Sequence, residues 1–363
     1  HTTASELEKH VLAKTQSLVR KRGLTLLARR SAWGFGALIL FYATFLLSGC
    51  VHPVTAGSLA NVTNSVPQFL PERDVFISHD GAELGLTVWA AQTDHEPEHV
   101  VVGVHGMNDF ANAFHMAAPY WAEHGVVTYA YDQRGFGRSP GRGLWPDEEL
   151  MREDLRTAVA VARRAHPDAT ITVVGISMGA AVAISAFGSD TPPDADRLIA
   201  SGPGLRGWGA MNPLYRASLW MSAHTNPGWI VRPPARFVRI EPSDNIDMLR
   251  ETWANPLMLR ENRIDQVYGV VSLMETAHDR IADLPVDLPV LISYGANDYV
   301  IPPHGVERSA NFLPAHVRTV YYEKGYHMLL RDLQAETVHA DYLAFMQHPD
   351  ADLPSRSSEW PFR

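Results

Sequence analysis

From about residue 73 onward, short apolar runs alternate with longer amphipathic stretches along the chain. Buried parallel strands consist of nearly continuous apolar and β-branched residues, whereas a helix repeats its apolar face every 3.6 residues. These patterns predict strands at 74–78, 84–90, 100–104, 126–131, 171–175, 197–200, 290–294 and 318–322, and helices at 113–124, 147–164 and 338–347. Because strands and helices alternate, we expect a mainly parallel sheet with helices on both faces.

Residues 203–278 interrupt this alternation. The segment contains several prolines, is enriched in tryptophan and methionine, and has no convincing buried strand. It predicts a helical insertion, or cap, over the carboxyl edge of the sheet, with the core formed by 73–202 and 279–363. The apolar residues of the cap either line a pocket as a lid or pack within the insertion, and packing is the expected role for most of them individually.

Residues 1–50 have the pattern of a secretory signal. Basic residues at 20–22 and 29–30 precede an uncharged apolar run at 33–47, and small residues follow. The run is shorter than the roughly 20 residues that a membrane-spanning helix needs. An uncleaved membrane anchor and a buried core helix are the alternatives, although the basic clusters argue against the core helix. Residues 51–72 are small and polar with scattered prolines, which is typical of a tether.

The chain has one cysteine, Cys50, which ends the tetrapeptide L-S-G-C. This tetrapeptide resembles the lipobox of bacterial lipoproteins. The resemblance implies that the Cys50 thiol is lipidated and becomes the N-terminus after cleavage, which would attach the protein to a membrane of the bacterial cell envelope. Val51 stands where an aspartate often retains such proteins at the inner membrane, so the periplasmic face of the outer membrane is favoured.

Composition excludes several classes of function. The chain has 363 residues, of which 46% are hydrophobic and 20% charged, as in ordinary globular proteins. The net charge of −9, with the acidic excess lying after residue 50, argues against binding to nucleic acid, which needs clustered Lys and Arg. A single cysteine permits neither an intramolecular disulfide nor a cysteine-based zinc site, and no histidine–carboxylate spacing predicts a metal. The G-x-G-x-x-G match at 202–207 contains Pro203 and lacks the acidic partner of a dinucleotide site, so we expect no cofactor.

The stretch G-I-S-M-G, centred on Ser177, directly follows the predicted strand at 171–175. This pattern is typical of a nucleophile elbow, in which a serine occupies a strained turn between a strand and a helix. Gly175 and Gly179 fit that turn, because side chains two residues away on either side would collide with the crowded backbone.

A serine hydroxyl needs an imidazole to accept its proton, and the imidazole needs a carboxylate to orient it. Asp298 and His327 each follow a predicted strand and come after Ser177 in the order Ser–Asp–His. Two other groups have simpler roles. We expect His105 to shape a neighbouring loop, and Asp132 to cap the turn that follows it.

Five motifs in order resemble the α/β-hydrolases: H-G-M-N-D, Y-D-Q-R-G-F-G-R-S, G-I-S-M-G, G-A-N-D and K-G-Y-H. Over about residues 73–345 the chain is most similar to their monoacylglycerol lipase and lysophospholipase-like branch, the serine aminopeptidase S33 type. The resemblance implies an eight-stranded, mainly parallel sheet, Ser177 as nucleophile, Asp298 as acid and His327 as base. It also implies an oxyanion hole formed by the backbone N–H groups of Met107 and Met178.

The hydrolase resemblance predicts a serine hydrolase that cleaves small acyl esters such as monoacylglycerols or lysophospholipids without a cofactor. Together with the lipobox it predicts a lipid-anchored enzyme, and we expect a monomer. Ile176 departs from the lipase branch, which often has histidine there, and this weakens the assignment of the substrate. A serine aminopeptidase of the related peptidase group is the second hypothesis. A non-catalytic envelope binding protein that retains the fold is the third.

Overall fold

The computed structural model describes residues 66–231 and 241–362. The predicted signal at 1–50, its Cys50 and most of the predicted tether lie outside these residues. In the part of the chain that the structure describes, no helix is long and apolar enough to cross a membrane.

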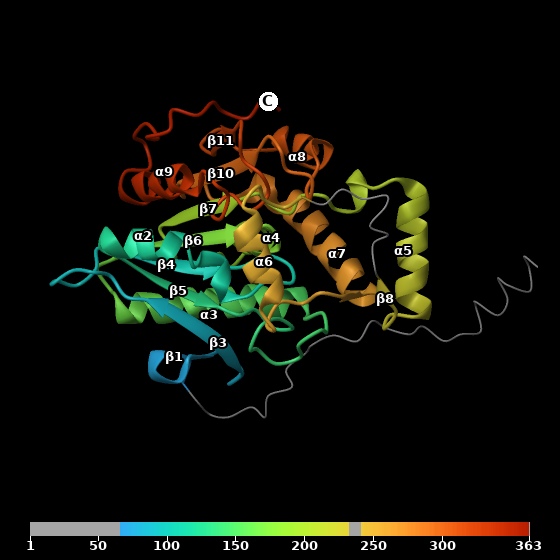
Figure 1. The fold of residues 1–363 in the computed structure, drawn as a ribbon, viewed down its shortest axis with the longest axis horizontal. Coiled ribbons are helices and arrows are strands. Elements are labelled where there is room, and N and C mark those ends of the chain that lie inside the picture. Colours follow the sequence, from blue (N-terminus) through green and yellow to red (C-terminus); the bar gives the residue numbers. More distant parts are fainter. Residues whose placement is uncertain (1–65, 232–240, 363) are drawn as a thin grey trace, which may run out of the picture. The chain divides into compact units, whose positions relative to one another are not determined.

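The described residues contain a sheet of nine strands in the order β1-β2-β3-β5-β4-β6-β7-β10-β11 (Figure 1). Its strands are β1 (Gln68–Leu70), β2 (Val75–Ile77), β3 (Glu83–Trp89), β4 (His99–Val104), β5 (Val126–Tyr131), β6 (Thr170–Ile176), β7 (Arg197–Ser201), β10 (Val290–Gly295) and β11 (Arg318–Tyr322). β1, β2 and β3 form an antiparallel meander that joins β5 antiparallel, and the strands from β5 to β11 pair in parallel. The mainly parallel sheet predicted from the sequence is confirmed.

The additional strand, β1, lies in the stretch that was expected to be a tether. Phe69 is opposite Phe76 of β2, and its ring stacks on Tyr129 of β5 at a centroid distance of 4.5 Å. A strand of three residues is too short to show a hydrophobic period, so only its packing reveals it.

Helices cover both faces of the sheet, as predicted (Figure 1). The helices of the core are α2 (Ala117–Glu123), α3 (Glu148–Ala165), α4 (Met178–Phe187), α8 (Pro303–Ala310) and α9 (Ala335–Gln347), and short 3₁₀ turns occupy η1 (Pro71–Arg73), η2 (Ala111–Phe114), η3 (Trp208–Ala210) and η4 (Ile281–Asp283). α3 and α4 share one buried apolar cluster with the sheet, represented by Leu155 and Ile184. α2 and α9 share a second cluster, represented by Trp121 and Tyr342.

The helix predicted at 113–124 is divided in the structure. η2 ends at Phe114, and α2 begins only at Ala117. Pro119 explains the division, because a proline ring clashes with the carbonyl group four residues earlier and is tolerated only in the first turn of a helix.

The insertion between β7 and β10 is helical, as predicted. It comprises α5 (Pro213–Thr225), β8 (Ile230–Val231), α6 (Ile246–Ala254), β9 (Asn262–Arg263) and α7 (Ile264–Arg280), and β8 pairs antiparallel with β9. α7 extends from the cap into the core, because its Leu273 and Ala277 belong to the same buried cluster as α4. The cap is therefore fixed to the core through its longest helix.

The C-terminal segment covers the outer edge of β11, the last strand in the sheet. The amide of Tyr321 donates to the carbonyl of Ser358 over 2.8 Å, and the amide of Trp360 donates to Oγ1 of Thr319 over 3.2 Å. The buried Trp360 ring packs edge-on against Tyr294 of the neighbouring strand.

Candidate active site

Ser177 stands between β6 and α4 in a strained backbone conformation, with φ 52° and ψ −112°. A residue with a side chain rarely adopts positive φ, and such strain is typical of nucleophile elbows. The flanking glycines make this conformation possible. A Cβ at Gly179 would lie 2.1 Å from the carbonyl oxygen of Val104, and one at Gly175 would lie 2.7 Å from Cα of Ala180. The predicted requirement for both glycines is confirmed.

The structure brings Ser177, His327 and Asp298 together. Nε2 of His327 lies 2.9 Å from Oγ of Ser177, and Nδ1 of His327 lies 2.7 Å from Oδ2 of Asp298. The amides of Val300 and Ile301 donate to the other carboxylate oxygen over 2.9 and 2.8 Å. Asp298 is therefore fixed as an acceptor, which places the imidazole proton on Nδ1 and leaves Nε2 free to accept from the serine hydroxyl.

Parallel pairing explains why these three residues meet. They follow β6, β10 and β11, whose carboxyl ends lie at one edge of the sheet. The cap insertion also leaves the sheet at this edge, after β7. Side chains at the carboxyl ends of parallel strands form the usual site of open α/β sheets.

Met107 and Met178, the two residues predicted to donate to an oxyanion, lie in segments that adjoin Ser177. Met178 is the first residue of α4, so its N–H lies at the positive end of the helix dipole. Met107 lies in the oxyanion loop, residues 105–109, which packs so closely on the nucleophile that a Cβ at Gly106 would be 3.2 Å from Cβ of Ser177. Within the described ranges, neither amide donates to an acceptor of the protein. Both N–H groups are thus available to an incoming oxygen.

His105 is fixed as a neutral, structural side chain. Its Nδ1 donates to the carbonyl of Gly106 over 2.7 Å, and its Nε2 accepts from the amide of Gln133 over 2.8 Å. Burial lowers the pKa of His105, so the ring stays unprotonated. The prediction that His105 shapes the loop is confirmed, and the exposed His304 lies on α8 outside the site.

Asp132 joins the turn after β5 to η2, as expected for a capping residue. Its carboxylate accepts from the amide of Ala111 and from the amide and side chain of Arg138, each over 2.8 Å. Burial opposes ionisation, but the hydrogen bonds and positive charge of Arg138, together with the Ala111 amide, outweigh it and lower the pKa of Asp132.

Residues 95–334 match the family described as serine aminopeptidase, S33. The chain belongs to this family. A monoacylglycerol lipase of Mycolicibacterium smegmatis is 29% identical over 234 residues, which cover 63% of this chain and 80% of the relative. A monoglyceride lipase of Rattus norvegicus is 22% identical over 288 residues, which cover 77% of this chain and 91% of the relative. The branch of the α/β-hydrolases that the motifs predicted is confirmed.

Solved structures support the same fold for this serine hydrolase. A monoacylglycerol lipase of Paleococcus ferrophilus has a TM-score of 0.59 and 22% identity, covering 73% of this chain and 98% of its own. A soluble variant of the Saccharomyces cerevisiae monoglyceride lipase, solved with a substrate analogue, has a TM-score of 0.63 and 19% identity. The match covers 83% of this chain and 99% of the lipase. At such identities the likeness establishes the α/β-hydrolase fold.

Sequence reasoning missed a buried ion pair that joins two loops of this serine hydrolase. Nη2 of Arg331, in the histidine loop (residues 323–334), donates to Oδ2 of Asp109 in the oxyanion loop. Both side chains are buried. The two residues are 222 positions apart, and no sequence spacing relates them.

A second missed group, Asp332, joins the histidine loop to the cap. One carboxylate oxygen accepts from the amide of Tyr326 over 2.7 Å, and the other accepts from Oγ of Ser243 over 2.6 Å. The amide of Met328 also donates to the carbonyl of Pro242 over 2.8 Å. Burial raises the pKa of Asp332 to about 7, since desolvation outweighs these hydrogen bonds.

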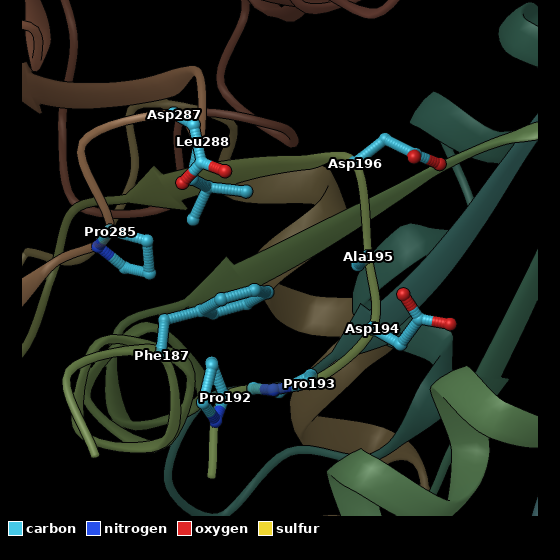
Figure 2. Close-up of a pocket in the computed structure, with 9 residues that line it drawn as sticks. All are labelled: Phe187, Pro192, Pro193, Asp194, Ala195, Asp196, Pro285, Asp287 and Leu288. Carbon is cyan, nitrogen blue, oxygen red and sulfur yellow. The ribbon is translucent and has the colours of Figure 1, made fainter. Parts of the chain in front are cut away.

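A pocket of about 310 Å³ lies on the opposite edge of the sheet from the triad. Figure 2 shows Phe187 at the end of α4 together with residues that precede β7 and β10, among them Asp194, Asp196 and Asp287. These residues precede the strands, whereas the triad residues follow theirs. The pocket therefore does not contribute to the catalytic chemistry.

Proposed function

We propose that the protein hydrolyses carboxylic esters of long-chain acids, of the monoacylglycerol or lysophospholipid type, through an acyl-enzyme. One observation carries the proposal. Ser177, His327 and Asp298 form a continuous hydrogen-bonded chain beside the free amides of Met107 and Met178. This arrangement contains each group that acyl transfer to serine needs.

The proposed reaction begins when Oγ of Ser177 attacks the ester carbonyl carbon and Nε2 of His327 accepts the hydroxyl proton. Asp298 stabilises the imidazolium, and the amides of Met107 and Met178 donate to the carbonyl oxygen as it becomes negative. The C–O bond of the ester then breaks, and the imidazolium gives its proton to the departing alcohol. Water, deprotonated by His327, attacks the acyl-serine in the same way, releases the acid and returns the proton to Ser177.

An apolar acyl chain suits the surroundings of the triad. A pocket of about 420 Å³ lies between α6 and the histidine loop, and its lining includes Ile246, Leu249, Trp253 and Tyr326. Tyr326 directly precedes His327 in the chain. Relatives named as monoacylglycerol and monoglyceride lipases support the same substrate class.

Aminopeptidase activity is the second candidate, because the family carries that description. An aminopeptidase must bind the charged amino group of its substrate, for which a carboxylate is the natural partner. The carboxylates of Asp109, Asp298 and Asp332 beside the triad are each engaged in hydrogen bonds within the protein. Glu241 and Asp244, which line the pocket between α6 and the histidine loop, have partners within the protein as well. Because these carboxylates already have partners, ester hydrolysis is favoured over aminopeptidase activity.

The test uses the detergent-solubilised full chain with p-nitrophenyl esters of increasing length, monoacylglycerols, lysophosphatidylcholine and aminoacyl p-nitroanilides. We expect turnover of the esters with a preference for longer acyl chains, and little release of nitroaniline. Ser177→Ala should lower kcat by roughly 10⁴-fold or more and abolish labelling by a fluorophosphonate. Undiminished turnover in this variant would refute the mechanism. Preferred cleavage of the anilides would favour the aminopeptidase, and no labelling of the wild type would favour the binding protein.

We also propose that Cys50 anchors the enzyme in the bacterial cell envelope, on the periplasmic face of the outer membrane. The L-S-G-C sequence supports this location. Exposed apolar side chains of α5 fit a position near lipid, since Leu214 is 80% and Tyr215 70% exposed. Labelling of cells with a radioactive fatty acid should mark the wild type and not Cys50→Ala. Equal labelling of the wild type and Cys50→Ala would overturn the proposed lipid anchor. The expected monomeric state stays a prediction, which light scattering can check.

A further inference from the structure

The oxyanion loop contains a tight turn that depends on Asn108. The amide of Asp109 donates to the carbonyl of Gly106 over 3.3 Å, which closes a turn with Met107 and Asn108 at its two central positions. Asn108 has φ 68°, the left-handed conformation that a type II turn requires at its second central residue. Glycine adopts this conformation freely, whereas asparagine tolerates it only at some energetic cost.

The cap holds Asn108 through three hydrogen bonds. Nδ2 of Asn108 donates to Oδ1 of Asn262 over 2.9 Å, and Nδ2 of Asn262 donates to Oδ1 of Asn108 over 2.6 Å. The amide of Leu259 donates to the backbone carbonyl of Asn108 over 3.0 Å. Both asparagines are partly buried, so these hydrogen bonds are sheltered from competition with water.

The backbone around Asn262 is held in place by secondary structure. It belongs to β9, where it pairs with Val231 of β8, and α7 begins two residues later. The next residue, Arg263, forms an ion pair with the buried Asp265 over 2.7 Å. A side chain on a paired strand, next to an anchored helix, can position a loop more precisely than a side chain on another loop.

We infer that Asn262 is a positioning residue for the oxyanion hole, and this inference rests on the proposed hydrolase function. By binding both polar atoms of the Asn108 side chain, it stabilises the left-handed turn that directs the Met107 N–H toward the substrate oxygen. Asn262 has no contact with the reacting atoms and acts only through Asn108 and Met107. The cap thus contributes to the chemistry itself, in addition to any part it has in binding the acyl chain.

The test compares Asn262→Ala with Asn262→Asp, which keeps the acceptor for Asn108 and loses the donor. We expect kcat on a p-nitrophenyl ester to fall about 10- to 100-fold in Asn262→Ala with KM changed less than about twofold, since a small misplacement of a catalytic group has effects of this size. The rate of fluorophosphonate labelling should fall in parallel, and Asn262→Asp should lie between. Arg260→Ala is the matched control, because Arg260 lies in the same segment of the cap and, among the described residues, donates to the Ala254 carbonyl rather than to the oxyanion loop. This variant should leave kcat unchanged.

The deciding measurement uses the Asn108→Gly background. Glycine adopts the positive φ unaided, so adding Asn262→Ala to Asn108→Gly should change kcat by less than about threefold. An equal loss in both backgrounds, an unchanged kcat in Asn262→Ala, or a loss confined to KM would each overturn the inference. If Asn262→Ala does not fold, Asn262→Asp and its combination with Asn108→Gly give the same comparison. Failure of the proposed function appears separately, as undiminished activity in Ser177→Ala.

Discussion

At the scale of single residues, Ser177 is constrained on both its backbone and its side chain. Positive φ brings its neighbours against β4, and its hydroxyl is held by His327. The glycines beside it matter because the atoms they face belong to the backbone and cannot move aside.

We predict that Gly179→Ala destabilises the fold and removes activity. Its Cβ would meet the carbonyl oxygen of Val104 at 2.1 Å, so β4 and α4 must separate. Overpacking of this kind costs about 1–3 kcal/mol, and the displaced nucleophile should lose most of its turnover. Urea unfolding and ester hydrolysis measure the two effects. Gly228→Ala is the control, because the nearest described atom to a Cβ there belongs to the flexible side chain of Arg263, at 3.3 Å. Equal unfolding curves for both variants would contradict the prediction.

Asp332 should make stability depend on pH. Burial raises its pKa from 3.8 to about 7, so between these values the folded protein holds a proton that the unfolded chain has released. Raising the pH through this range therefore lowers the free energy of unfolding, by up to about 1.4 kcal/mol per pH unit for one proton. Asp332→Asn cannot titrate, yet its amide can still accept from Tyr326 and donate to Ser243.

Urea unfolding of wild type and Asp332→Asn at pH 5, 6, 7 and 8 measures this contribution. We expect the wild type to lose stability relative to the variant as the pH rises to about 7, and the two curves to run parallel above it. Parallel curves throughout this range would show that the carboxyl group is ionised in the folded protein.

At the scale of elements, Arg134 ties the β2–β3 turn to α3. Its buried guanidinium binds the carboxylates of Asp80 and Asp154 through four hydrogen bonds of 2.7 to 2.8 Å. Arg134→Met should therefore cost about 3–5 kcal/mol, because it leaves the buried Asp154 and the partly buried Asp80 without their guanidinium partner. Arg73→Ala breaks the exposed pair with Glu83 and should cost less than about 1 kcal/mol. Chemical denaturation measures the loss in unfolding free energy for Arg134→Met and for Arg73→Ala. Similar losses in the two variants would show that burial does not strengthen the interactions of Arg134.

The sequence predicted those elements whose hydrophobic pattern is long enough to be distinctive. The buried parallel strands and α3 lie within a few residues of their predicted bounds. β1 was not recognised, because three residues show no hydrophobic period and the strand is defined by its pairing with β2 and by the stacking of Phe69 on Tyr129. The division at 113–124 follows from Pro119, a local signal that the periodic pattern concealed.

At the scale of the whole molecule, the triad was predictable because each member follows its own strand within a short motif. The contacts that support the oxyanion loop were not predictable. Asn108 and Asn262 are 154 positions apart, and Asp109 and Arg331 are 222 apart. Their meeting depends on how the cap and the histidine loop pack against the oxyanion loop, which no local pattern encodes.

The exposed apolar side chains of α5 lead to a prediction about the position of the protein at a membrane. Leu214 and Tyr215 should insert into lipid and strengthen membrane binding even without the proposed lipid anchor. For the chain beginning at Val51, combining Leu214→Ser with Tyr215→Ser should weaken flotation with vesicles roughly tenfold or more, while turnover of soluble p-nitrophenyl acetate stays unchanged. Unaltered flotation would place the lipid-facing surface elsewhere.

The C-terminal segment that lies along β11 has a consequence for self-association. An uncovered edge strand offers its amides and carbonyls to any other strand, and folded proteins aggregate through such edges. The C-terminal segment shields this edge of β11, because Ser358 accepts from the Tyr321 amide and Trp360 donates to the Thr319 side chain. Proteolytic cleavage after Asp352 would keep every triad residue and expose the aggregation-prone edge of β11. Loss of these last residues in a protease-rich compartment should therefore appear first as insoluble protein, and only afterwards as lost catalysis.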